Sequence, residues 1–157
     1  MSKQELKQKG FTIIEVVLVL AIAALIFLMV FIALPALQKS QRDTARKNDV
    51  SVIAGAVSSW QGNNRSGSFP TNTQIREYAD NVSGNTDLAA LTVVAGPTSG
   101  STEYTIADDA AVRVYTEAKC DSVSAEGKVT LSAGTKRQYA TVTRLESGNS
   151  SGYCLDS

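Results

Sequence analysis

The chain opens with ten mostly polar residues, MSKQELKQKG, and then becomes strongly apolar. The stretch FTIIEVVLVLAIAALIFLMVFIALPAL, from Phe11 to Leu37, contains one charged residue, Glu15, and none from Val16 onward. At about 1.5 Å of rise per residue, a helix of this length crosses the hydrocarbon layer of a bilayer. The pattern therefore predicts a membrane-spanning helix over residues 11–37.

Beyond Leu37 the helical pattern continues in a polar form. The stretch QKSQRDTARKNDV holds no helix-breaking residue. Apolar residues then recur at steps of three and four: Val50, Ile53, Val57 and Trp60. This spacing lines one face of a helix, which we expect to pack against a sheet. Because Gly62 and turn-forming residues follow, we expect a single helix over residues 11–61.

The remainder, residues 62–157, shows shorter elements. TNTQIREYAD, residues 71–80, predicts a short helix capped by Asn72 or Thr73, and residues 81–101 are expected to be loop with one turn of helix. Runs of β-branched and aromatic residues predict four strands, over residues 103–106, 111–118, 128–131 and 138–146. The expected fold class is α+β, with a long N-terminal helix packed on a small antiparallel β-sheet and a head formed by residues 62–157.

Charge and composition limit the function. The 15 basic and 15 acidic residues balance, and the exposed portion is mildly acidic, which argues against nucleic-acid binding. The chain has no histidine, which removes most hydrolase mechanisms, so we expect no enzyme activity and no catalytic residue. The acids Glu103, Asp108, Asp109 and Asp121 lack the spacing of a calcium-binding loop, and we expect surface acids, no metal and no cofactor.

Glu15 is the residue that the apolar pattern leaves unexplained. A carboxylate within a membrane segment is costly and is rarely kept without a partner, so Glu15 is a functional candidate. The pattern K-x-K-G-F-T-x-x-E, from Lys7 to Glu15, is followed at once by the apolar helix. This arrangement resembles the amino terminus of type IV pilins and of the related pseudopilins of type II secretion and competence systems. The resemblance covers roughly the first third of the chain.

The resemblance implies a processing event and an assembly role. A membrane peptidase would cut between Gly10 and Phe11, so that residues 1–10 are a leader, and the new amino terminus of Phe11 would be methylated. Glu15 would then pair with the terminal amine of a neighbouring subunit. Opposite charges at low dielectric each need a counter-charge, which is compatible with this pairing. The resemblance also places the leader in the cytoplasm and the remainder outside.

Pro35 marks a departure from the family. Many type IV pilins have a glycine midway along the span and a proline earlier than Pro35, whereas this chain has no glycine between Phe11 and Ala54. Pro35 lacks a backbone N–H and crowds the carbonyl four residues earlier, so we expect a kink or local loosening there. We also expect a filament of this subunit to loosen over a shorter helical segment than its relatives.

The two cysteines, Cys120 and Cys154, both lie in the portion that the resemblance places outside the membrane. An oxidising compartment favours a disulfide between them, and many type IV pilins have a similar disulfide-bounded region near the carboxyl end. The alternative is a pair of free thiols.

Taken with these features, the resemblance implies a structural subunit, favoured as the major pilin, of a type IV pilus that serves motility, adhesion or DNA uptake. The protein would be a single-pass membrane protein before assembly and an extracellular filament afterwards. Its partners would be copies of itself, the prepilin peptidase, the assembly platform and ATPase, and a host or neighbouring cell surface. The alternatives are a pseudopilin of a secretion or competence system and, less favoured, a membrane-anchored binding domain.

Overall fold

The structure is a computed structural model that describes residues 10–65, 67–79, 86–108 and 110–157. The chain divides into two compact units, one ending at Gln38 and the other spanning Lys39–Ser157. The helix α1 (Ile13–Asn63) contributes to both units. From here on, "the head" means this second unit, Lys39–Ser157, which includes the last part of α1 as well as residues 62–157.

The helix α1 begins and ends two residues later than the sequence pattern predicts, and it continues through Pro35. Within the head, its apolar face is buried as expected: Val50, Ile53 and Val57 are fully buried and Trp60 is 7% exposed. These residues recur at helical spacing on one side of α1, so burying that side places them all in the core.

Among the described residues after α1 there are two short helices. The first is α2 (Asn72–Tyr78), capped by Thr71 and not by Asn72 or Thr73, because Thr71 and Gln74 form a reciprocal capping box. The second is the 3₁₀ turn η1 (Leu88–Ala90), whose start is capped by the Asp87 side chain. For residues 81–101 the sequence predicts loop with one helical turn. Residues 81–85 lie outside the described part, and the helical turn is η1, but residues 92–95 form a strand instead of loop.

The described residues of the head also include seven strands. They are β1 (Thr92–Ala95), β2 (Ser101–Thr105), β3 (Val112–Thr116), β4 (Ala118–Val123), β5 (Lys128–Ala133), β6 (Tyr139–Arg144) and β7 (Gly152–Asp156). Each of the four predicted strands overlaps an observed one, at β2, β3, β5 and β6. The sequence did not predict β1, β4 or β7.

The strands form two sheets, one of four strands in the order β1-β3-β6-β7 and one of three in the order β2-β5-β4. All pairings are antiparallel except that β1 runs parallel to β3. The α+β class is confirmed, but the single predicted sheet is two sheets. The division arises at Glu117, a residue with positive φ through which the chain passes from β3 into β4 of the other sheet.

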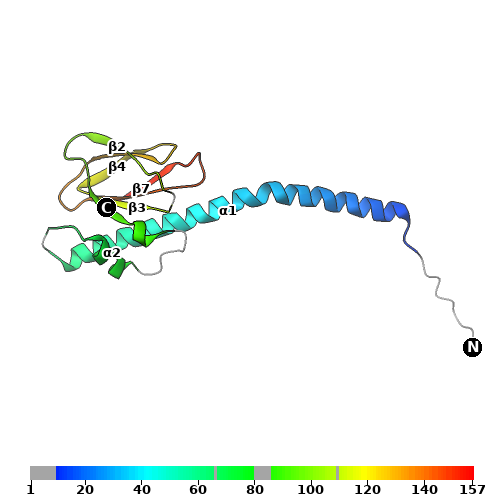
Figure 1. The fold of residues 1–157 in the computed structure, drawn as a ribbon, viewed down its shortest axis with the longest axis horizontal. Helices are drawn as coiled ribbons and strands as arrows, with labels where there is room; N and C mark the ends of the chain where they lie inside the picture. Colours follow the sequence, from blue (N-terminus) through cyan, green and yellow to red (C-terminus); the bar gives the residue numbers. More distant parts are fainter. Residues whose placement is uncertain (1–9, 66, 80–85, 109) are drawn as a thin grey trace, which may run out of the picture. The chain divides into compact units, whose positions relative to one another are not determined.

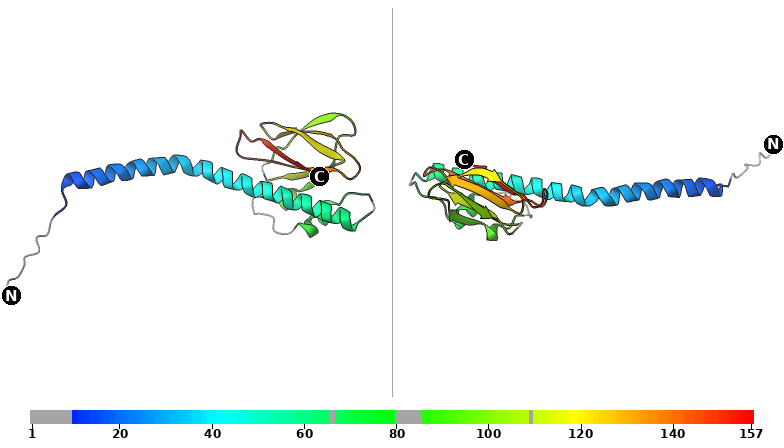
Figure 2. Two further views of the ribbon diagram at one scale, coloured as in Figure 1. Left: turned by 180° about the vertical axis from the view of Figure 1, so that it is seen from behind. Right: turned by 90° about the horizontal axis from the view of Figure 1, so that it is seen from above.

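The head has three layers, in which the four-stranded sheet lies between α1 and the three-stranded sheet. One core cluster joins the buried face of α1 to Val112, Val114 and Tyr139, which point from the four-stranded sheet toward the helix. The alternate residues Tyr115, Ala140 and Val142 pack in a second cluster against the three-stranded sheet. Figures 1 and 2 show the strands gathered beside the part of α1 that belongs to the head.

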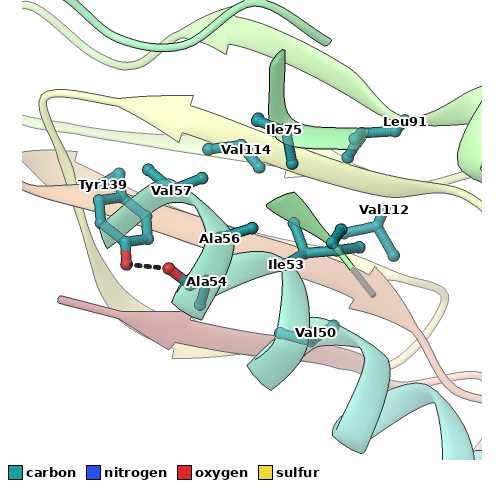
Figure 3. Packing of buried hydrophobic residues seen from close by; sticks show 11 residues of the cluster. Val50, Ile53, Ala54, Ala56, Val57, Ile75, Leu91, Val112, Val114 and Tyr139 are labelled. Carbon is teal, nitrogen blue, oxygen red and sulfur yellow. Dashed lines mark hydrogen bonds between the residues drawn. The ribbon is translucent and has the colours of Figure 1, made fainter. Parts of the chain in front are cut away.

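Tyr139 connects the four-stranded sheet to α1. Its hydroxyl donates a hydrogen bond of 2.6 Å to the carbonyl oxygen of Ala54 on α1, and it lies 2.6 Å from the Ser58 hydroxyl. Figure 3 shows this bond among the apolar side chains of the cluster. Because the ring is only 2% exposed, burial raises the pKa of the Tyr139 hydroxyl, which stays neutral and able to donate.

A disulfide between Cys120 on β4 and Cys154 on β7 joins the two sheets at neighbouring edges. This is the pairing that the sequence predicts. The side chains beside Cys154 on β7, Tyr153 and Leu155, pack against the core cluster of α1. The disulfide therefore fixes the last strand between the helix and the outer sheet.

Candidate functional site at the start of α1 and the base of the head

The expected cleavage junction lies immediately before α1. Gly10 and Phe11 are exposed, and neither belongs to the helix, which begins at Ile13. Phe11 is 89% exposed. An exposed backbone segment outside regular structure is the kind that a peptidase can reach. Residues 1–9 of the expected leader lie outside the described part of the chain.

Glu15 forms a capping box with Thr12 at the first turn of α1. Its Oε2 accepts a hydrogen bond of 2.8 Å from the Thr12 backbone N–H and one of 2.7 Å from the Thr12 hydroxyl. In return, the Glu15 backbone N–H donates to the Thr12 hydroxyl at 3.4 Å. The carboxylate is thereby held at the positive end of the helix. The spacing T-x-x-E in the sequence is the signal for this capping box. The role of Thr12 as the capping residue was not predicted.

The segment of α1 that follows Glu15 exposes apolar side chains on every side. All its large hydrophobic residues from Val16 to Leu37 are exposed, and no charged residue lies among them. The helix is long and apolar enough to cross a membrane. A helix that is apolar all round needs burial in lipid or against other apolar helices.

A second polar site, which we call the base clamp, lies within the head. It consists of Arg42, Asp43 and Arg46 on α1 together with Glu146 and Ser147 in the turn between β6 and β7. The Glu146 carboxylate accepts hydrogen bonds of 2.6–3.0 Å from the Arg42 guanidinium and one of 2.7 Å from Arg46. The Asp43 carboxylate accepts bonds from the backbone N–H groups of Glu146, at 2.7 Å, and Ser147, at 2.9 Å.

The base clamp is charged but largely withdrawn from solvent, since the side chain of Arg46 is 6% exposed and that of Glu146 is 17% exposed. Hydrogen bonds from Arg42 hold the pKa of Glu146 below its usual value. Burial alone would raise the pKa of Asp43, but the hydrogen bonds from Ser147 and Glu146 outweigh it and the pKa is lowered. Both carboxylates therefore remain ionised at neutral pH.

The base clamp was not predicted from the sequence, although a signal for it was present. Asp43 and Arg46 continue the series of buried positions that passes through Val50 and Ile53 at steps of three and four. Charged residues in phase with an apolar face are buried if the helix continues to pack, and buried charges require partners. The partner, Glu146, is about a hundred residues away in the chain and is supplied by the tertiary fold alone.

The acids considered for calcium do not converge. The Glu103 carboxylate lies 3.5 Å from the Lys128 ammonium, and one oxygen of Asp121 accepts from the Ser101 hydroxyl. Asp108 accepts from the backbone N–H of Ala110, and Asp109 lies outside the described residues. Among the residues that the structure describes, no group of three or more potential ligands is placed to hold a metal ion.

A known family model matches the amino-terminal part of the chain. Residues 6–31 match the model of the prokaryotic N-terminal methylation motif, which covers the junction at Gly10, the capping box and most of the apolar segment. Comparisons with curated proteins and with solved structures give no significant match. The motif together with the long apolar N-terminal helix fits a type IV pilin.

The motif supports a protein of the type IV pilin-like or pseudopilin class. Proteins of this class are structural subunits and are generally not enzymes. The motif implies processing by a prepilin peptidase and polymerisation, and the apolar helix is consistent with a membrane-anchored precursor. The individual roles assigned to Gly10, Phe11, Glu15 and Pro35 stay predictions.

Proposed function

We propose that this protein is the major subunit of a type IV pilus. It is made as a precursor, held in the membrane by residues 11–37, cut between Gly10 and Phe11, methylated at Phe11 and then polymerised into an extracellular filament. The observation that supports this most is the methylation motif at residues 6–31, which runs directly into a helix whose apolar side chains are exposed on every side.

The chemistry of the junction supplies a reason for Glu15. Hydrolysis of the peptide bond after Gly10 creates an ammonium group on Phe11, four residues before Glu15. In a setting of low dielectric, that cation and the carboxylate of a neighbouring subunit satisfy each other, and neither then remains an unpaired charge. Thr12 holds the carboxylate at the helix start, which keeps it close to the level of the new terminus.

Polymerisation would also bury the exposed apolar side chains of residues 16–37. Before assembly, lipid covers the side chains between Val16 and Leu37, and in the filament the same surfaces would pack against copies of the same helix. The head, whose own core is complete without the segment, would remain on the outside. A compact head together with Glu15 favours a subunit that repeats along the shaft.

The test is a Glu15→Ala substitution in the full-length chain, expressed in a host that has the assembly machinery. We expect wild-type cells to shed filaments whose main component has the mass of methylated residues 11–157. The Glu15→Ala chain should be processed and retained in the membrane while shed filaments disappear. Glu77→Ala, which removes an exposed acid from α2, is the matched control and should assemble normally.

Two outcomes would contradict the proposal. Wild-type protein that remains in the membrane as a monomer would support a membrane-anchored binding domain instead. Unchanged filaments from the Glu15→Ala chain would remove the role assigned to the carboxylate. The pseudopilin alternative shares the motif, and short fibres that remain attached to a secretion apparatus would favour it over long shed filaments.

A further inference from the structure

Pro35 is a weak point in the hydrogen-bond ladder of α1. It lies inside the helix, has no N–H to donate to the carbonyl of Phe31, and its ring crowds that carbonyl. A helix loosens most easily at such an interruption, and the loosening spreads because each lost hydrogen bond frees the next residue. The division of the chain into two units falls three residues later, between Gln38 and Lys39.

The base clamp lies on the first turns of α1 beyond that division. Three residues of α1 within residues 42–46 carry side chains bonded to a turn that is about a hundred residues away in sequence. Loosening this part of the helix would withdraw Arg46 and Asp43 from partners that they reach only in the folded head. Since both residues are buried, that separation carries the cost of breaking buried charge contacts.

We propose that the base clamp is a helix stop. It keeps residues 42–46 helical and attached to the turn between β6 and β7 when the backbone around Pro35 loosens, so that changes in the apolar segment do not spread into the head. The apolar core cluster takes in α1 from Val50 onward, so the clamp holds the turns of the helix that precede this core. This inference does not depend on the proposed function.

A pair of hydrogen bonds at the other end of the same helix, which we call the Gln61–Arg137 tie, provides an internal comparison. The Arg137 guanidinium donates to the carbonyl oxygen of Gln61 at 3.3 Å, and the Gln61 side-chain amide donates to the carbonyl oxygen of Arg137 at 3.3 Å. This tie also joins α1 to a turn between strands, but it lies at the end of α1 that is remote from Pro35. Removing it should have only a local effect on the last turn of the helix.

The experiment is hydrogen exchange with mass spectrometry on the full-length chain in detergent micelles, comparing wild type with Glu146→Gln and Arg137→Gln. In Glu146→Gln we expect the protection of amides 39–50 to fall by about tenfold to a hundredfold, while β3 amides in the same sample change much less. Arg137→Gln should affect amides near residues 60–63 only. Adding Pro35→Ala to Glu146→Gln should restore much of the lost protection, because the alanine N–H can donate the missing helical hydrogen bond to the carbonyl of Phe31.

If Glu146→Gln prevents folding, Arg42→Gln replaces it, since Arg42 is the partly exposed member of the clamp and its loss should produce the same pattern at smaller amplitude. The proposal is overturned if amides 39–50 keep wild-type protection in these variants. It is also overturned if protection falls equally in β3, or if Pro35→Ala gives no recovery, because the clamp would then contribute only to general stability.

Discussion

Removal of the Cys120–Cys154 disulfide should lower the stability of the head by about 3–4 kcal/mol. The two cysteines are separated by 34 positions, and the chain-entropy relation for a loop of that size gives about 3.8 kcal/mol at 25 °C. The physical reason is that the bond restricts the unfolded chain more than the folded one. In the folded head the two strands are already placed side by side by the sheets.

The variant is Cys120→Ser combined with Cys154→Ser, which leaves no free thiol. Trp60 is the single tryptophan and is 7% exposed. Its fluorescence therefore follows the unfolding of the head in urea. With a slope of about 2 kcal/mol per molar urea, typical of a domain of this size, the midpoint should fall by roughly 2 M. Ser122→Ala, an exposed change on β4, is the control and should leave the midpoint in place.

An unfolding midpoint of the double variant within about 0.5 M urea of the wild-type midpoint, at an unchanged slope, would contradict this prediction. That result would mean that the disulfide does not restrict the unfolded chain, or that it strains the folded head by an equal amount. Reduction and alkylation of the wild-type protein should reproduce the shift without any substitution, which separates the effect of the bond from that of the serine side chains.

Three further predictions concern the head and use the same urea assay. Tyr139→Phe should lower the unfolding free energy by about 1 kcal/mol, because it deletes the hydroxyl that donates to α1; an unchanged midpoint would contradict that role. Thr141→Val should be neutral or stabilising, since the buried Thr141 hydroxyl has no hydrogen-bond partner among the described residues, and a loss above about 1 kcal/mol would reveal a partner. Acid should destabilise the head: the pKa values of Asp43 and Glu146 are lowered by folding, so their contribution is full above about pH 4 and is lost as the pH falls through the folded values. A midpoint that stays constant from pH 7 to about pH 3 would contradict this.

The site at the start of α1 could be predicted almost completely from the sequence because it is local. The junction at Gly10, the acid at Glu15 and the apolar segment lie within thirty residues of one another, and the capping box with Thr12 depends only on spacing along one helix. The same holds for the buried face of α1 and for the cap of α2, where the pattern from Thr71 to Gln74 was present but was assigned to the wrong residue.

Several strands could not be predicted from local sequence patterns. β1 has four residues, three of them exposed, and β7 begins with a glycine and contains a cysteine, so neither carries a clear alternating pattern. The run over residues 111–118 predicts one strand because it is rich in β-branched and aromatic residues. The backbone turns at Glu117 and divides the run between two sheets. The β-sheet propensities of these residues do not predict that turn.

The amino-acid sequence alone is enough to predict the features that lie along a single segment: the junction at Gly10, a helix too apolar to remain in water, one acid in its first turn, and the face by which the helix packs in the head. Which distant groups meet depends on the tertiary fold. The partnership of Asp43 and Arg46 with Glu146, the bond of Tyr139 to α1 and the layering of two sheets all join residues that are far apart in the chain. Each depends on side chains that the folded backbone brings within hydrogen-bonding distance, and such distances are not encoded in the spacing of neighbouring residues.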